Sequence, residues 1–188
     1  MSLKELTMQQ HQNAERQKFA SILMSGKIPK ISYLRYLVNQ HVCYTALENH
    51  PDFKIPDLRL ERSLLIQQDI DDLRMDLGNN AFIEDIVLTD STLNYEKHVK
   101  DNIKTFDNFM AHVYVRYLGD LRGGQMIAKK TPGTGNYYKF ENPNELANII
   151  YRQLNDDMAD EARIVFDFAT QLFIEMHGLM VDKNEWKS

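Results

Sequence analysis

The spacing of apolar residues constrains the fold more than any other feature of this sequence. Along most of the 188 residues, apolar side chains recur every three or four positions, and the alternating pattern of half-buried strands is scarce. An all-α fold is therefore expected. The periodic segments predict helices over residues 3–24, 32–48, a stretch after Pro56 that ends at Gly78, a short piece at 82–87, 89–104, 106–130, a helix that starts at Asn142-Pro143, and 160–180.

Turn and capping residues mark the ends of these segments. Thr89 offers an N-cap, and Asn142-Pro143 reads as an N-cap and first turn with Glu145 at the capping-box position. Residues 131–136 (TPGTGN) are expected to form a loop. The sequence shows no internal repeat, low-complexity tract or linker, so residues 1–188 are expected to form a single domain.

Composition and charge exclude several classes of protein. The net charge of −5 gives no electrostatic support for nucleic-acid binding. Cys43 is the only cysteine, which excludes an intrachain disulfide and a cysteine metal cluster. The first residues lack the pattern of a secretion signal, and no apolar run approaches the ~20 residues that a membrane span needs. We therefore expect a soluble, cytoplasmic protein that binds neither membrane nor nucleic acid.

Three glycines interrupt the helical segment at 106–130. Each interior glycine destabilises a helix by roughly 1 kcal/mol relative to alanine. Gly119 and Gly123 are four residues apart, so they expose bare backbone on one helix face, and Gly124 favours a kink. Such a face lets something flat lie against the backbone. Close packing of another helix is an equal alternative from the pattern alone, whereas a phosphate loop is disfavoured because no strand precedes the glycines.

Residues 116–125, RYLGDLRGGQ, closely resemble the signature of the heme oxygenase family. The match differs at Arg122, where the family usually has serine, and the resemblance continues along most of the chain in the same order. It implies a helical bundle that holds heme between a proximal N-terminal helix and a kinked, glycine-rich distal helix. The backbone of Gly119, Gly123 and Gly124 would then lie over the heme.

The resemblance also points to one histidine as the ligand of the heme iron. His11 precedes Ala14-Glu15 with the spacing of the family's proximal segment, and a neutral imidazole is a good axial ligand. Glu15 could steady His11 by a contact behind the ligand, although a solvated helix charge is a serious alternative. His112 matches a family histidine that does not bind the iron.

Further positions match residues that hold the heme in this family. Lys4, Tyr114 and Arg152 fall where the family anchors the two propionates, although lysine and arginine at such positions are more often plain surface charges. Phe166 and Phe173 match aromatic positions of the pocket. Because they are seven residues apart on an apolar stripe, they are also ordinary core residues.

The implied activity is oxidative opening of heme b, as substrate and cofactor, by O2 to biliverdin (IX-alpha is expected), ferrous iron and CO. Asp120 would hold a water chain that delivers protons, with Tyr44 and Arg116 as supports. Two departures from the family pattern concern the pocket. Asn148 stands where many members have lysine, and Ala169 replaces an asparagine that the family often uses on the last helix.

The sequence carries no flavin or dinucleotide fingerprint, so electrons must come from a partner. The resemblance is to soluble members served by ferredoxin, and a downstream bilin reductase is a further expected partner. The expected pathway is bilin pigment synthesis or iron recovery. Four cations could form a docking patch for ferredoxin, although a solvated face is the plainer interpretation of each: Lys18, Lys27, Lys30 and Arg35.

Two other functions remain open from the sequence. A heme carrier or sensor on the same scaffold would bind heme without yielding biliverdin. An enzyme of the related thiamin-degrading architecture would need a nucleophilic cysteine in a polar cleft. Cys43 lies on an apolar helix beside Tyr44, where an inert buried thiol is expected instead.

Overall fold

The computed structural model describes residues 1–78 and 86–187, and every regular element in those ranges is helical. The all-α prediction is confirmed. The α-helices are α1 (Leu3–Glu15), α2 (Lys18–Met24), α3 (Lys30–Glu48), α4 (Ser63–Leu77), α5 (Asp90–Asn102), α6 (Phe106–Val113), α7 (Gly119–Arg122), α8 (Gly124–Ala128), α9 (Pro143–Tyr151) and α10 (Ala159–Asp182). A π-helical segment, Tyr114–Leu118, joins α6 to α7, and short 3-10 turns include Leu58–Leu60 and Asn136–Tyr138.

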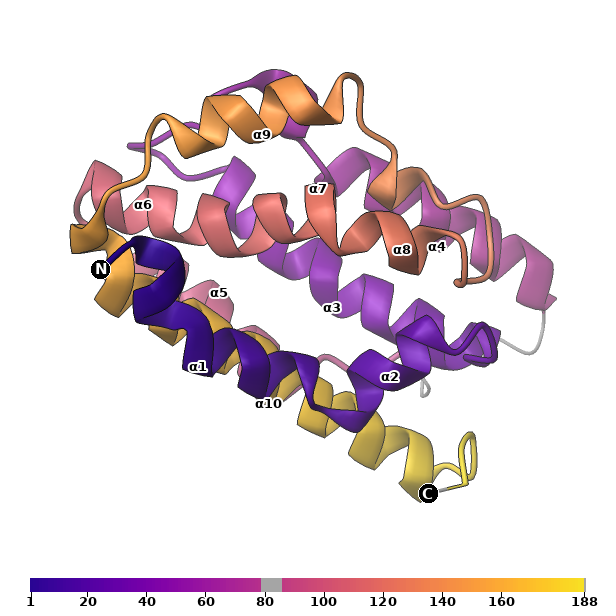
Figure 1. Cartoon of the computed structure of the whole chain (residues 1–188). Coiled ribbons are helices and arrows are strands. Elements are labelled where there is room, and N and C mark those ends of the chain that lie inside the picture. Colours follow the sequence, from indigo (N-terminus) through magenta and orange to yellow (C-terminus); the bar gives the residue numbers. More distant parts are fainter. Residues whose placement is uncertain (79–85, 188) are drawn as a thin grey trace.

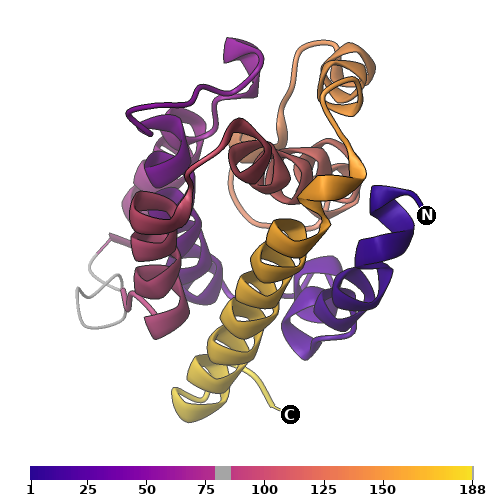
Figure 2. The ribbon, with the colours of Figure 1, turned by 90° about the vertical axis from the view of Figure 1, so that its left-hand side faces the viewer.

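Two groups of helices face each other across the molecule. The N-terminal helices α1 and α2 run along α10, while α6, α7 and α8 form a row on the opposite side (Figure 1). Turned by 90°, the molecule shows α10 between α1–α2 and the group made by α3, α4 and α5 (Figure 2). The N-terminal helices and the glycine-rich row thus face each other in the fold.

The helix α3 contributes many side chains to the hydrophobic core. Eleven of its 19 residues are buried, apolar and polar side chains together, and Leu34, Leu37 and Leu47 are fully buried. A helix that is buried on more than one face belongs in a core. Its tyrosines, including Tyr36 and Tyr44, bring hydroxyl groups into that core.

One helix in the described ranges, Asp156–Asp182, is long and apolar enough to cross a membrane by length and composition alone. Its buried stripe includes Ala162, Val165, Leu172 and Met176. These side chains pack in the same core as α1, α2, α5 and α6. Contacts within the fold therefore account for the buried stripe of α10, which is 28% of its most apolar window.

The prediction of one helix over residues 3–24 is wrong, because the structure has two helices there, α1 and α2. Residues Arg16 and Gln17 separate α1 from α2, and Gln17 has extended backbone. The Gln17 side chain donates to the carbonyl of Asn13 at 3.0 Å, which satisfies an acceptor at the end of α1. The bend lets Phe19 and Leu23 on α2 point into the core, where both are fully buried.

Other boundaries also differ from the sequence pattern. α4 begins at Ser63, because residues 58–60 form a separate 3-10 turn. α9 begins at Pro143 as expected, but Asn142 has a left-handed backbone and makes no capping bond. Glu145 pairs with Arg59 at 3.1 Å instead of closing a capping box. The Thr89 cap is confirmed by its hydroxyl, which accepts from the Thr92 N–H at 3.2 Å. The piece expected at 82–87 falls mostly outside the described residues.

Arg35 does not belong to a surface patch, which corrects the expectation for this residue. Its side chain is 1% exposed and donates to both carboxylate oxygens of Glu185, at 2.7 and 2.8 Å. The hydroxyl of Ser32 donates to the same carboxylate at 2.7 Å. This buried ion pair ties the start of α3 to the C-terminal end of the chain, so Arg35 cannot dock a partner.

Candidate functional site

A cavity of about 580 Å³ opens between the N-terminal helices and the glycine-rich row. Pockets of this size hold ligands as large as a cofactor. Its walls are mostly apolar and come from α1, α2, α3, the row from Tyr114 to Ala128, and α10. Its lining includes His11, Glu15, Tyr44, Arg116, Gly119, Asp120, Gly123, Gly124, Phe166, Ala169 and Phe173.

The three glycines differ in how much room a side chain would have at each position. A Cβ built on Gly119 would meet nothing within 4 Å, and one on Gly123 would meet only the Gly119 carbonyl, at 3.6 Å. These two glycines therefore present bare backbone to the cavity. A Cβ on Gly124 would lie 2.6 Å from the Tyr138 ring, so Gly124 is required by its packing against Tyr138. The irregular backbone expected near Gly124 begins earlier, in the π-helical segment from Tyr114 to Leu118.

This difference predicts opposite effects for two alanine substitutions. Gly119→Ala should leave the free energy of unfolding unchanged or raise it by up to about 1 kcal/mol, because alanine favours helix. It should nevertheless weaken ligand binding, since its methyl group projects into the cavity. Gly124→Ala should destabilise the protein by about 1–3 kcal/mol through overpacking against Tyr138. Urea unfolding and ligand titration of both variants test this, and equal destabilisation by the two would contradict it.

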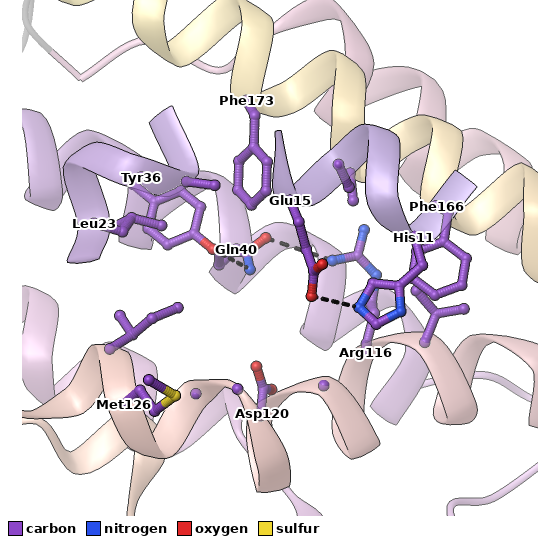
Figure 3. A pocket seen from close by; sticks show the side chains of 18 of the residues that line it. His11, Glu15, Leu23, Tyr36, Gln40, Arg116, Asp120, Met126, Phe166 and Phe173 are labelled. Carbon is purple, nitrogen blue, oxygen red and sulfur yellow. Dashed lines mark hydrogen bonds and ion pairs between the residues drawn. The ribbon is translucent and has the colours of Figure 1, made fainter. Parts of the chain in front are cut away.

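His11 lies on the α1 side of the cavity, opposite Asp120 (Figure 3). Its ring stacks on Phe166, with 5.1 Å between centroids and 17° between planes. Its Nε2 is 2.9 Å from Glu15 Oε1, and both side chains are substantially exposed. Glu15 thus contacts His11, and its supporting role behind the ligand stays a prediction. The contact is to Nε2, however, so a ligand at Nε2 must displace Glu15.

Asp120 is the buried carboxyl group at the floor of the cavity. The hydroxyl of Tyr44 donates to its Oδ2, and the hydroxyl of Tyr137 lies 3.1 Å from its Oδ1. Burial raises the pKa of Asp120 to about 7, although these hydrogen bonds and the cations Arg62 and Arg116 act in the opposite direction. A carboxyl group with such a pKa exchanges protons near neutral pH.

Arg116 supports this carboxyl group from the same helical row. Its guanidinium lies 4.0 Å from the centre of the Tyr95 ring and 3.4 Å from Gln40 Oε1. Its buried Nε has no hydrogen-bond partner among the described residues. The Tyr44 hydroxyl is also 3.4 Å from the Arg116 carbonyl oxygen. The structure therefore brings together the three residues predicted for proton delivery, Asp120, Tyr44 and Arg116.

The sequence reasoning missed Tyr137 and Gln40. The Gln40 amide donates to the Tyr137 hydroxyl at 3.1 Å and to the Tyr36 hydroxyl at 3.0 Å (the latter drawn in Figure 3). The turn that carries Tyr137 is held by Asp69 of α4, which accepts from the Tyr137 N–H at 2.9 Å. Arg62 donates to the Tyr137 carbonyl at 2.8 Å. The only signal in the sequence was a loop rich in glycine and proline, which says nothing about where Tyr137 points.

Replacing Tyr137 by phenylalanine should raise the pKa of Asp120. The substitution removes a hydroxyl that stabilises the charged carboxylate, and a hydrogen bond to a charged group contributes about 1.5–3 kcal/mol. We expect the pH profile of turnover to move upward by about one unit. Tyr138→Phe is the matched control, because Tyr138 stacks on Tyr137 at 4.1 Å without contacting Asp120. An unchanged profile for Tyr137→Phe would exclude its hydroxyl from the network.

The predicted propionate anchors do not line the cavity. Tyr114 lies at its border, with its ring edge-on to Phe166 at 6.4 Å and its hydroxyl 3.5 Å from Thr7 Oγ1. Lys4 and Arg152 are exposed, in the first turn of α1 and at the end of α9. The anchoring roles of all three stay predictions.

The two predicted pocket phenylalanines lie at the cavity wall. Phe166 and Phe173 both line the cavity, and Phe173 also packs on Phe19 at 5.8 Å. Both interpretations of these residues, pocket and core, therefore hold.

Cys43 is 1% exposed, does not line the cavity, and has a pKa raised by burial. This placement disfavours the nucleophilic-cysteine alternative.

Comparison with known proteins decides the family. The sequence model of the family described as heme oxygenase matches residues 1–175. The chain belongs to the heme oxygenase family. Its relatives include heme oxygenase 1 of Synechocystis, 27% identical over 95% of this chain and 85% of the relative. Heme oxygenase 1 of Rattus norvegicus is 25% identical over 100% of this chain and 74% of the relative.

Solved structures of heme oxygenases share the fold. The structure from Leptospira interrogans superposes with a TM-score of 0.76 at 25% identity, covering 93% of this chain and 100% of the other. The Synechocystis heme oxygenase-1 structure, a complex with heme, also gives 0.76, at 24% identity, covering 96% and 93%. At that identity the second likeness concerns the fold alone.

The residues of this cavity fit the heme that gives the family its name. Bare backbone at Gly119 and Gly123 leaves room for a flat ring, since added Cβ atoms would project into open or barely occupied space. His11 offers an imidazole on the opposite wall, and Phe166 offers an aromatic surface beside it. The unpaired Nε of Arg116 is a donor left for water or ligand.

Proposed function

We propose that this protein binds heme b as its substrate and opens the ring with O2 and external electrons, releasing biliverdin, ferrous iron and CO. Membership of the heme oxygenase family supports the reaction. The observation that carries the proposal for this chain is one juxtaposition. An imidazole on α1 faces the bare backbone of Gly119 and Gly123 across a cavity, with a buried carboxyl group, Asp120, beside them.

His11 is the proposed ligand of the heme iron. When bound, heme supplies the metal at which O2 is activated. His11 would turn its Nε2 away from Glu15, whose exposed carboxylate is free to remain near the ring as a hydrogen-bond acceptor. Phe166, already stacked on the imidazole, restricts the orientation of His11. Lys4, Tyr114 and Arg152 are the proposed partners of the propionates.

Asp120 is the proposed proton-delivering residue. Tyr44 and Tyr137 hold its two carboxylate oxygens in place, so a water molecule at the cavity floor would meet a carboxyl group of defined orientation. Its pKa of about 7 allows the group to take up and return a proton during turnover. The glycine backbone beside it keeps other side chains from competing for the same space.

Ferredoxin is the proposed electron donor, and the cytoplasm the proposed location. Lys18, Lys27 and Lys30 are exposed near α2, which forms one wall of the cavity, whereas Arg35 is withdrawn from this patch. Clustered cations speed association with an acidic protein. Bilin pigment synthesis, through a downstream bilin reductase, or iron recovery would use the products, and the IX-alpha isomer is the proposed biliverdin.

A turnover assay tests this function. The protein is mixed with heme, ferredoxin, ferredoxin reductase and NADPH in air, and the biliverdin absorption band is followed. We expect the heme band to disappear as the biliverdin band grows. Turnover should also fall as salt is raised from about 0.01 to 0.3 M, because screening weakens docking to the lysine patch. Stable heme binding without biliverdin would favour the carrier or sensor alternative, and salt-insensitive turnover would argue against the patch.

A further inference from the structure

A second group of metal-ligating side chains lies outside the cavity. His98 of α5, His112 of α6 and Glu161 of α10 converge in the core, and none of them lines the cavity. Their donor atoms all lie within 4.8 Å of one another. Glu161 Oε1 is 2.6 Å from His98 Nε2 and 2.8 Å from His112 Nε2. Two imidazoles from different helices thus share one carboxylate oxygen.

We propose that His98, His112 and Glu161 form a binding site for a divalent transition-metal ion of the Zn²⁺ class. Two imidazole nitrogens and one carboxylate oxygen are a frequent protein ligand set for such ions. A fourth position would be taken by water. The site does not depend on the heme chemistry proposed above.

The distances permit an ion without rebuilding the fold. Metal–ligand bonds of about 2.0–2.2 Å place the ligand atoms of a tetrahedral ion roughly 3.3 Å apart. The two nitrogen–oxygen contacts, at 2.6 and 2.8 Å, therefore need to lengthen by about 0.5–0.7 Å, and the two histidine nitrogens, which are within 4.8 Å of each other, need to reach the same spacing. Each ligand lies on a separate helix, so rotation of its side chain can change these distances while the backbone stays in place.

The surroundings of the three ligands suit a cation. The His112 side chain is fully buried, and its Nε2 faces the Glu161 carboxylate oxygen that His98 Nε2 also contacts. The Tyr95 hydroxyl is 2.7 Å from His112 Nδ1 and fixes the ring from behind, as partners of metal-bound histidines commonly do.

An ion can reach the site from solvent. The side chains of His98 and Glu161 are 15% and 11% exposed, whereas His112 is fully buried at the inner end. Binding would clamp α5, α6 and α10 together. Since only the folded chain brings the three ligands together, the ion should also raise the stability of the protein.

Titration of the heme-free protein with Co²⁺, after treatment with a chelator, tests the site. Four-coordinate Co²⁺ gives visible absorption bands, and we expect them to saturate at one ion per chain and to disappear when Zn²⁺ is added. The melting temperature should rise with either ion. His98→Ala and Glu161→Gln should weaken Co²⁺ binding at least tenfold. Circular dichroism checks that both variants remain folded, and His98 is the milder change because it is partly exposed.

His11→Ala is the matched control, because His11 and Glu15 form the other close histidine–carboxylate pair in the described part of the chain. This variant should keep the Co²⁺ bands and the affinity of the wild type. The proposal is overturned if the wild-type protein shows no saturable Co²⁺ binding, in which case the cluster is a hydrogen-bonded clamp only. It is equally overturned if the bands vanish in His11→Ala and persist in folded His98→Ala.

Discussion

Asp120→Asn is expected to reduce biliverdin formation at least about 100-fold while heme still binds. Positioned acids and bases contribute roughly 10²–10⁴ in rate, and asparagine cannot give up a proton. The amide has nearly the shape of the carboxyl group, so the cavity should keep its form. Electrons from the proposed donor, ferredoxin, should then be lost to O2 as hydrogen peroxide. Biliverdin absorbance and a peroxide assay measure the two outcomes, and wild-type rates of biliverdin formation would disprove the role of Asp120.

The same substitution should make the folded protein more stable at neutral pH. Burial raises the pKa of Asp120 from 3.8 to about 7, so folding takes up a proton between these values. Stability is therefore lost as the pH rises through this window, and the loss is complete above pH 7. A shift of this size corresponds to about 4 kcal/mol as an upper bound. Asparagine cannot ionise, so the variant does not lose this stability as the pH rises.

Urea unfolding at pH 5 and pH 8 separates this effect from simple packing. The gain in free energy of unfolding should be larger at pH 8, where the wild-type carboxylate is ionised. Asp69→Asn is the control, because Asp69 is also buried but accepts hydrogen bonds from the backbone N–H groups of Asn136 and Tyr137. It should be destabilising. An equal gain for Asp120→Asn at both pH values would mean that the raised pKa is not its source.

His11→Ala is expected to abolish the spectrum of histidine-ligated heme. The imidazole projects from α1 into the cavity and its side chain is 43% exposed, so its removal should hardly change stability. Added imidazole should occupy the space left beside Phe166 and restore the spectrum. Absorption and resonance Raman spectroscopy of the ferric complex measure both effects.

His41→Ala serves as the matched control for this variant. His41 is half-buried on α3 and does not line the cavity, so its loss should leave the heme spectrum unchanged. If His11→Ala keeps the wild-type spectrum without imidazole, another residue binds the iron. The lining of the cavity would then have to supply a different ligand.

Local sequence determined the helices and the chemical character of the site. Apolar spacing predicted α3, α5 and α10 to within a few residues, because one-sided burial imposes this period on any helix that packs, and Asn142-Pro143 predicted the start of α9. The unbroken run RYLGDLRGGQ placed Asp120 and two bare glycines on one helix. These relations hold within a few residues of chain, where backbone geometry alone decides which side chains share a face.

Only the tertiary structure decided which distant residues meet at the site. Tyr137 reaches Asp120 because Asp69 and Arg62 hold its turn against α4, a contact between segments more than 65 residues apart. Arg35 is buried because its guanidinium pairs with the carboxylate of Glu185, 150 residues away in the sequence. Sequence spacing cannot reveal such pairs, since burying a charge or hydroxyl group is favourable only where a partner from elsewhere in the chain arrives.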